Sequence, residues 1–119
     1  MKRIVRISAG LAIACSLFAS PASAAPPASI GACGACHSAD GTNGLGPSFK
    51  RVYGRKAGTG NGFRYSTAMR KAGITWDDES LDAFIADPQK AIPGNVMAFS
   101  GVMDAKRRAE IIDYLKTVK

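Results

Sequence analysis

Apolar residues recur with a helical period in the second half of this 119-residue chain. Leu81, Phe84 and Ile85 stand at positions i, i+3 and i+4, which predicts a helix with one apolar face that continues to about Ala86. The stretch Thr75-Trp76-Asp77-Asp78 has the form of a capping box, and we expect it to open this helix.

A second apolar stripe follows Asp104, a residue type that favours the N-cap of a helix. Pro88 ends the preceding helix, and the loop from Ala91 to Val102 is expected to turn at Pro93-Gly94. The residues expected along the buried stripe of the final helix are Ala105, Ala109, Ile112 and Leu115.

The rest of the chain after residue 24 shows no long helical period. Pro26 and Pro27 leave room only for a short turn around Ile30, and residues 38–62 have the Gly-, Asn- and Pro-rich composition of a loop. Residues 66–72 predict a short helix that Gly73 ends. No run alternates as a strand does, so we predict an all-α fold with three to four short helices. A loop as long as 38–62 in so small a domain needs something central to organise it.

Residues 1–24 have the pattern of a secretory signal peptide. A positive region at residues 2–6 precedes an apolar run from Ile7 to Ala19, and Ala22-Ser23-Ala24 supplies a cleavage site. The run is shorter than the roughly 20 residues that a membrane span needs. We therefore expect export to the periplasm, cleavage, and a single domain at residues 25–119 with no membrane span.

Charge changes this picture only slightly. Without residues 1–24 the chain has 13 basic and 9 acidic side chains, a formal charge of +4. A modest positive charge suits steering toward acidic protein surfaces. The basic residues are scattered and lack interleaved aromatic side chains, so nucleic-acid binding is not expected.

The candidate chemistry lies in Cys33-Gly34-Ala35-Cys36-His37, a Cys-x-x-Cys-His motif typical of c-type haem attachment. On a helical turn these three side chains stand at i, i+3 and i+4 and share one face. Cys33 and Cys36 can then bond the two vinyl groups of one haem c while His37 ligates its iron. The motif predicts one covalently attached haem.

Three other interpretations of the motif are possible. A thioredoxin-like redox pair expects a βαβ pattern around it, which is missing here. A zinc site needs three or four protein ligands, and the mature chain offers only two Cys and one His. A plain disulfide gives no reason for a histidine directly after the second cysteine.

The second axial position of the iron has several candidates. His37 is the only histidine, so the choice lies among a lysine, an open site and the methionines Met69, Met97 and Met103. Met97 stands out because it follows Pro93-Gly94 in a loop between two helices, where a side chain can be directed at a ligand rather than packed. A thioether ligand raises the reduction potential, and two filled axial positions block oxygen and peroxide chemistry.

Several separate motifs in this order make the chain resemble a class I c-type cytochrome of the cytochrome c and cytochrome c2 kind over residues 30–119. The resemblance implies the cytochrome c fold, with short helices and long loops wrapped around the haem, and iron ligation by His37 and Met97. The matching stretches, besides the haem motif, are Gly46-Pro47, Gly54-Arg55-Lys56, Trp76, the segment 92–99 and Tyr114-Leu115-Lys116.

The resemblance also implies roles for single residues. The carbonyl group of Pro47 would accept the proton of the far imidazole nitrogen of His37. The side chains of Arg55, Tyr65 and Trp76 would surround the buried propionate, Asn95 would stand where the family usually has a hydroxyl group near the propionates, and Phe99 would cover the haem edge. The final helix would cross the segment before Cys33, with Tyr114 and Leu115 in the contact.

Two departures from the family pattern concern the distal side. Phe84 stands where the mitochondrial pattern has a tyrosine whose hydroxyl group reaches the methionine sulfur. Met69 stands where that pattern has an asparagine. Both replacements remove polar groups and predict a more apolar distal side.

The leading functional hypothesis is a monomeric periplasmic electron carrier that meets its donor and acceptor proteins transiently, and not an enzyme. One alternative is a haem-c subunit of a periplasmic dehydrogenase or oxidase complex. Another is a peroxidase or gas-binding protein, which needs an open or labile distal position.

Overall fold

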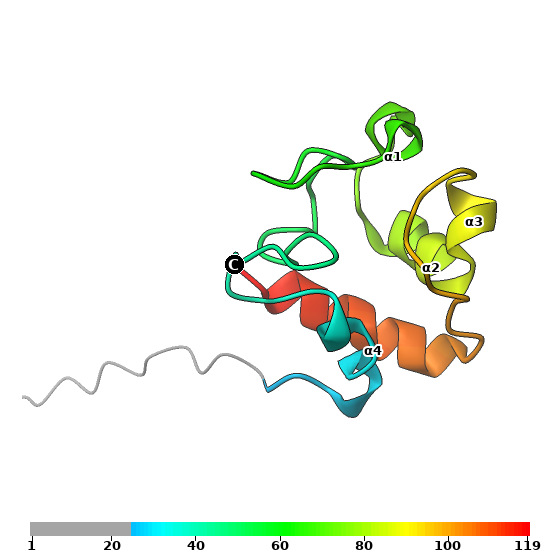
Figure 1. Ribbon diagram of the computed structural model, residues 1–119. Coiled ribbons are helices and arrows are strands. Elements are labelled where there is room, and N and C mark those ends of the chain that lie inside the picture. The colour runs from blue at the N-terminus through cyan, green and yellow to red at the C-terminus, as the bar shows by residue number, and fades with distance from the viewer. Residues whose placement is uncertain (1–24) are drawn as a thin grey trace, which may run out of the picture.

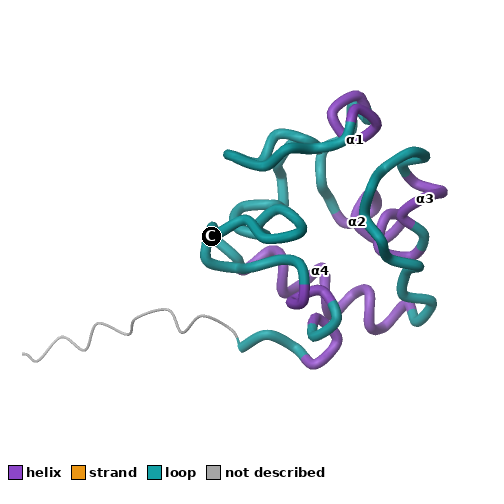
Figure 2. The backbone as a smooth tube through the Cα atoms, viewed as in Figure 1, coloured by secondary structure: helices purple, strands orange, loops and turns teal. Residues whose placement is uncertain are grey.

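The computed structural model describes residues 25–119, so the predicted signal peptide at residues 1–24 lies outside the described part. Figures 1 and 2 show a chain in which short helices are joined by long loops. No strand occurs within residues 25–119, where one isolated bridge joins Lys56 to Thr75, and the all-α prediction is confirmed. The helical elements are two 3₁₀ turns, η1 (Ala28–Ile30) and η2 (Cys33–Ala35), and four α-helices, α1 (Thr67–Lys71), α2 (Asp78–Ala86), α3 (Pro88–Ala91) and α4 (Ala105–Thr117).

Two predicted helix starts are confirmed by their caps. The side chain of Ser66 accepts a hydrogen bond from the N–H of Met69 at the start of α1, and Asp104 accepts from two N–H groups at the start of α4. Gly73, which follows the C-cap residue Ala72 of α1, has a φ of 71°, a conformation that favours glycine at a helix end. Residues 38–62 form a loop without helices, as predicted.

The predicted start of α2 was displaced by two residues. The capping box is formed by Asp77 and Ser80, not by Thr75 and Asp78, because Thr75 still belongs to the bridge with Lys56. The four-residue helix α3 was not predicted. Asp87 ends α2 and also caps α3, whose first residue is Pro88, so this proline both stops one helix and begins the next.

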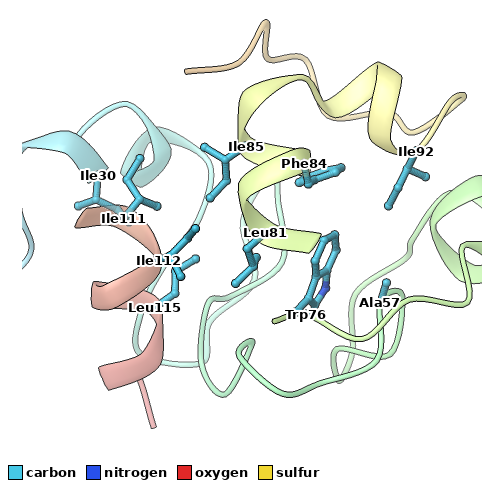
Figure 3. Close-up of a cluster of buried hydrophobic side chains, with 10 residues drawn as sticks. All are labelled: Ile30, Ala57, Trp76, Leu81, Phe84, Ile85, Ile92, Ile111, Ile112 and Leu115. Carbon is cyan, nitrogen blue, oxygen red and sulfur yellow. The ribbon is translucent and has the colours of Figure 1, made fainter. Parts of the chain in front are cut away.

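The core is built by α2 and α4, with η1 packed against α4 (Figure 3). Leu81, Phe84 and Ile85 are buried on α2, as its apolar stripe predicted. In Figure 3, Ile30 of η1 lies against Ile111 of α4, so the predicted crossing of the final helix over the segment before Cys33 is present.

The predicted buried stripe of α4 was partly wrong. Ile112 and Leu115 are buried, but Ala105 and Ala109 are exposed, and Ile111 is buried in their place. The helix therefore turns its larger branched side chains inward, because these bury more apolar area than alanine does. None of the helices in residues 25–119 has the length and apolar character needed to cross a bilayer.

Candidate haem site

A cavity of about 470 Å³ lies between the haem motif, the loop that follows it, α1, α2 and the loop after α3. The structure brings every sequence-predicted site residue to the wall of this one cavity. These ten residues are Cys33, Cys36, His37, Pro47, Arg55, Tyr65, Trp76, Asn95, Met97 and Phe99.

The haem motif forms the helical turn that its spacing predicted. The N–H groups of Cys36 and His37 both donate to the carbonyl oxygen of Cys33, at 3.1 and 2.9 Å. Cys33 and Cys36 are not joined to each other by a disulfide. Cys33 is half-buried, and its burial raises the pKa of the thiol above the usual value, whereas Cys36 is exposed.

The imidazole of His37 is oriented by its surroundings. Its Nδ1 lies 2.6 Å from the carbonyl oxygen of Pro47, which can only accept, so Nδ1 carries the proton. The other nitrogen, Nε2, is then unprotonated and free to bind a metal ion. Phe49 stacks on the ring with centroids 4.6 Å apart and planes inclined by 17°. The hydrogen bond and the stacking together fix both the tautomer and the plane of the ring.

A second part of the wall can receive an acidic group. The Nε of Arg55 is buried and has no hydrogen-bond partner, while Nη1 of the same side chain donates to the carbonyl oxygen of Lys50 at 3.0 Å. The hydroxyl oxygen of Tyr65 accepts from the N–H of Gly60 at 3.1 Å, which leaves the hydroxyl proton for another acceptor. A carboxylate placed here would satisfy the orphaned donor of Arg55.

These features fit the group that the motif predicts. The wall combines a largely apolar lining with two thiols, one metal-binding nitrogen and one unpartnered guanidinium N–H. A haem needs each of these, because its macrocycle is apolar, its vinyl groups bond thiols and its propionates are anionic. Trp76 and Phe84 supply part of the apolar wall, with ring centroids 5.1 Å apart and planes inclined by 58°.

The three candidate methionines are separated by their positions. Met69 and Met97 line the cavity, while Met103 lies outside its wall with 89% of its surface exposed. Met97 is carried by the loop after α3, as the sequence predicted, and Met69 by helix α1. The turn before Met97 has Pro93 at its second position and Gly94 at its third with a φ of 85°, the requirements of a type II turn.

Two further residues shape the site without a clear signal in the sequence. Phe49, which stacks on His37, carried no signal beyond its place two residues after Pro47. Gly46 belongs to one of the stretches that resemble the family. Its role is steric, because a Cβ atom there would lie 2.8 Å from Nε2 of His37 and closer still to Nδ1 and Cε1.

Comparisons with known proteins point to one family. A family model described as cytochrome c matches residues 28–119. The chain is 49% identical over 94 residues to cytochrome c2 iso-2 of Magnetospirillum molischianum, covering 78% of this chain and 97% of that one. It is 48% identical over 87 residues to cytochrome c of Euglena viridis, covering 72% and 85%. Among solved structures, cytochrome cH from Methylobacterium extorquens superimposes with a TM-score of 0.73 at 46% identity, covering 75% and 91%.

Proposed function

The chain belongs to the cytochrome c family, and from that membership we propose that it is a periplasmic carrier of single electrons whose axial ligands are His37 and Met97. It is an electron-transfer protein, and Cys33 and Cys36 bind its haem c covalently. When bound, the haem supplies the one-electron Fe(III)/Fe(II) couple. The observation that carries the proposal is the Nδ1–Pro47 hydrogen bond, which leaves Nε2 of His37 available in a cavity that Met97 also lines.

Some residues of the cavity wall would bind the haem, and others would exclude water from it. His37 and Met97 would both ligate the iron. Arg55 would give its unpartnered N–H to a propionate, assisted by the hydroxyl group of Tyr65. Trp76 and Phe99 would exclude water from the macrocycle, and this low-dielectric wall favours the less charged ferrous state.

Electron transfer requires a donor and an acceptor protein. We propose that both contacts are transient and that the protein is monomeric, not a fixed subunit of a dehydrogenase or oxidase. The pattern of residues 1–24 supports cleavage after Ala24 and export to the periplasm. Mass spectrometry of the periplasmic protein should give a chain that begins at Ala25, and native extracts should yield it free of partner subunits.

A closed axial site also argues against enzymatic activity. If His37 and Met97 both ligate the iron, no coordination position would be open to peroxide or a gas. The competing function, a peroxidase or gas-binding protein, requires high-spin or ligand-accessible iron.

The ferric spectrum of the holoprotein tests this proposal. Low-spin iron with the weak methionine–iron charge-transfer band is expected, and the band should vanish in Met97→Ala. Met69→Ala and Met103→Ala are matched controls that should keep the band. A band that persists in Met97→Ala, or a high-spin spectrum of the unmodified protein, would overturn the assignment of Met97.

A further inference from the structure

Asn95 makes more hydrogen bonds than a residue of a surface loop normally needs. It lies two residues before Met97 and is buried, with 6% of its surface exposed. Its side-chain Nδ2 donates to the carbonyl oxygens of Pro88 and Ile92, both at 2.8 Å. Its Oδ1 accepts from the backbone N–H of Met97 at 2.9 Å. The side chain thus connects helix α3 to the backbone of the proposed ligand.

The main chain of Asn95 is held on the same helix. Its N–H donates to the carbonyl oxygen of Ile92 at 3.1 Å, and its carbonyl oxygen accepts from Nε2 of Gln89 at 2.9 Å. With the three side-chain bonds, Asn95 makes five hydrogen bonds, four of them to residues 88–92. Both its main chain and its side chain are therefore fixed to residues 88–92, and its side-chain oxygen accepts from Met97.

This arrangement leaves the side chain no donor for a propionate. An amide NH₂ group has two hydrogens, and the carbonyl oxygens of Pro88 and Ile92 take both. The family resemblance had placed Asn95 where a hydroxyl group lies near the propionates. In this chain the polar atoms of the Asn95 side chain bond the carbonyl groups of Pro88 and Ile92 and the backbone of Met97, which points to a different role.

We propose that Asn95 is a positioning residue for Met97. Its Oδ1 fixes the backbone of Met97 in an Asx-type turn, and its Nδ2 ties that turn to the carbonyl groups of Pro88, the first residue of α3, and Ile92, the residue that follows it. The neighbouring Val96 has 76% of its surface exposed, so packing on the outer side of the loop adds little restraint. The amide of Asn95 therefore sets how firmly the thioether of Met97 is held toward the cavity.

The inference rests on the proposed ligation by Met97, and imidazole competition tests it. Imidazole replaces a loosely held methionine on ferric iron, and its apparent affinity reports how readily Met97 leaves. In Asn95→Ala the restraint on Met97 is lost, and the apparent affinity of the holoprotein for imidazole should rise about tenfold. Asn95→Thr should recover part of this change, because a hydroxyl group can accept from the same N–H and donate to one carbonyl group.

Asp87→Ala is the matched control. Asp87 is exposed and caps α3 through the N–H of Lys90, so its loss weakens the same helix without touching Asn95 or Met97. If Asn95 acts by positioning, Asp87→Ala lowers the stability to guanidinium chloride and leaves imidazole affinity within about twofold. The inference would be overturned if Asp87→Ala raised the imidazole affinity in proportion to the stability that this variant loses. It would also be overturned if Asn95→Ala left the imidazole affinity unchanged.

Two further variants separate the possible failures. Gln89→Ala removes one bond to Asn95 at an exposed position, and it keeps the test open if Asn95→Ala does not fold. An increase of about two- to threefold in imidazole affinity is expected, and no increase would count against the inference. Met97→Ala tests the ligand itself. If this variant keeps the charge-transfer band, the proposed ligation fails. If the band is lost but Asn95→Ala leaves the imidazole affinity unaltered, only the role of Asn95 is overturned.

Discussion

Gly46 passes directly against the ring of His37. A Cβ atom at residue 46 would lie 2.8 Å from Nε2 and closer still to Nδ1 and Cε1, so the backbone can approach the imidazole only because residue 46 has no side chain. The next residue, Pro47, supplies the carbonyl oxygen that accepts from Nδ1. One tight segment therefore both limits the space around the ring and sets its tautomer.

We predict that Gly46→Ala reduces the yield of holoprotein several-fold, because the added methyl group displaces His37 from the carbonyl group of Pro47. Gly34→Ala is a matched control inside the haem motif, since a Cβ atom there meets nothing within 4 Å. The haem content per chain, measured by the pyridine haemochrome spectrum, checks the prediction. Equal haem content in the two variants would contradict it.

A second close approach joins the end of the Met97 loop to α2. Gly101 has a φ of 105°, and a Cβ atom there would lie 2.8 Å from the carbonyl carbon of Ala86 and closer to its oxygen. The next residue, Val102, donates from its N–H to the carbonyl oxygen of Ile85 at 2.8 Å. This segment can lie on α2 only if residue 101 is glycine.

Gly101→Ala should therefore lower the free energy of unfolding by more than about 2 kcal/mol, because backbone strain and a backbone clash add. Gly54→Ala separates the two causes, since Gly54 has a φ of 78° but open space around it. Gly54→Ala should lower the free energy of unfolding by only about 1 kcal/mol. Guanidinium chloride unfolding measures both, and equal losses would show that the clash with Ala86 is relieved at no cost.

Arg108 ties α4 to α2 and to the same loop. Its Nε lies 2.7 Å from Oδ1 of Asp82, and its Nη1 donates to the carbonyl oxygens of Val102 and Met103, both at 2.9 Å. Arg108→Ala should cost about 2 kcal/mol of unfolding free energy, because three partners lose their donor. Asp82→Ala should cost less, since its side chain is 47% exposed and the two carbonyl bonds remain.

The exposed neighbour Arg107 provides the control for this comparison. Arg107→Ala should change the unfolding free energy by no more than about 0.5 kcal/mol. If thermal or guanidinium unfolding gives the same value for Arg107→Ala and Arg108→Ala, the network around Arg108 does not stabilise the fold.

Phe84 is the position at which a polar group should alter the potential. It is buried, lines the cavity and packs against Trp76. We expect Phe84→Tyr to change the reduction potential measurably, because the hydroxyl group adds a dipole to an apolar wall near the proposed methionine ligand. Protein-film voltammetry gives the answer, and a potential equal to that of the unmodified protein would show that position 84 does not act on the ligand.

Local sequence patterns were sufficient for much of the fold. Asp104 was readable as a helix cap because its side-chain oxygen bonds N–H groups only two or three residues away. The stripe of Leu81, Phe84 and Ile85 was readable because its period is a property of one helix. The errors came where a distant contact decided the outcome, as at Thr75, whose bridge to Lys56 moves the start of α2 to Asp77.

The chemistry of this protein could be predicted from its sequence. The Cys-x-x-Cys-His spacing specifies haem attachment because a helical turn places its three side chains on one face, and that geometry needs no distant residue. The chain has a single histidine, so a second histidine of the same chain cannot be the other iron ligand.

How those groups are held depends on contacts between segments that lie apart in the sequence. The stacking of Phe49 on His37 and the close pass of Gly46 depend on where the loop after the haem motif returns in space. The same is true of the inward turn of Ile111, which replaces Ala105 and Ala109 in the core. Such contacts follow from the packing of the whole chain, which a local pattern of polar and apolar residues does not contain.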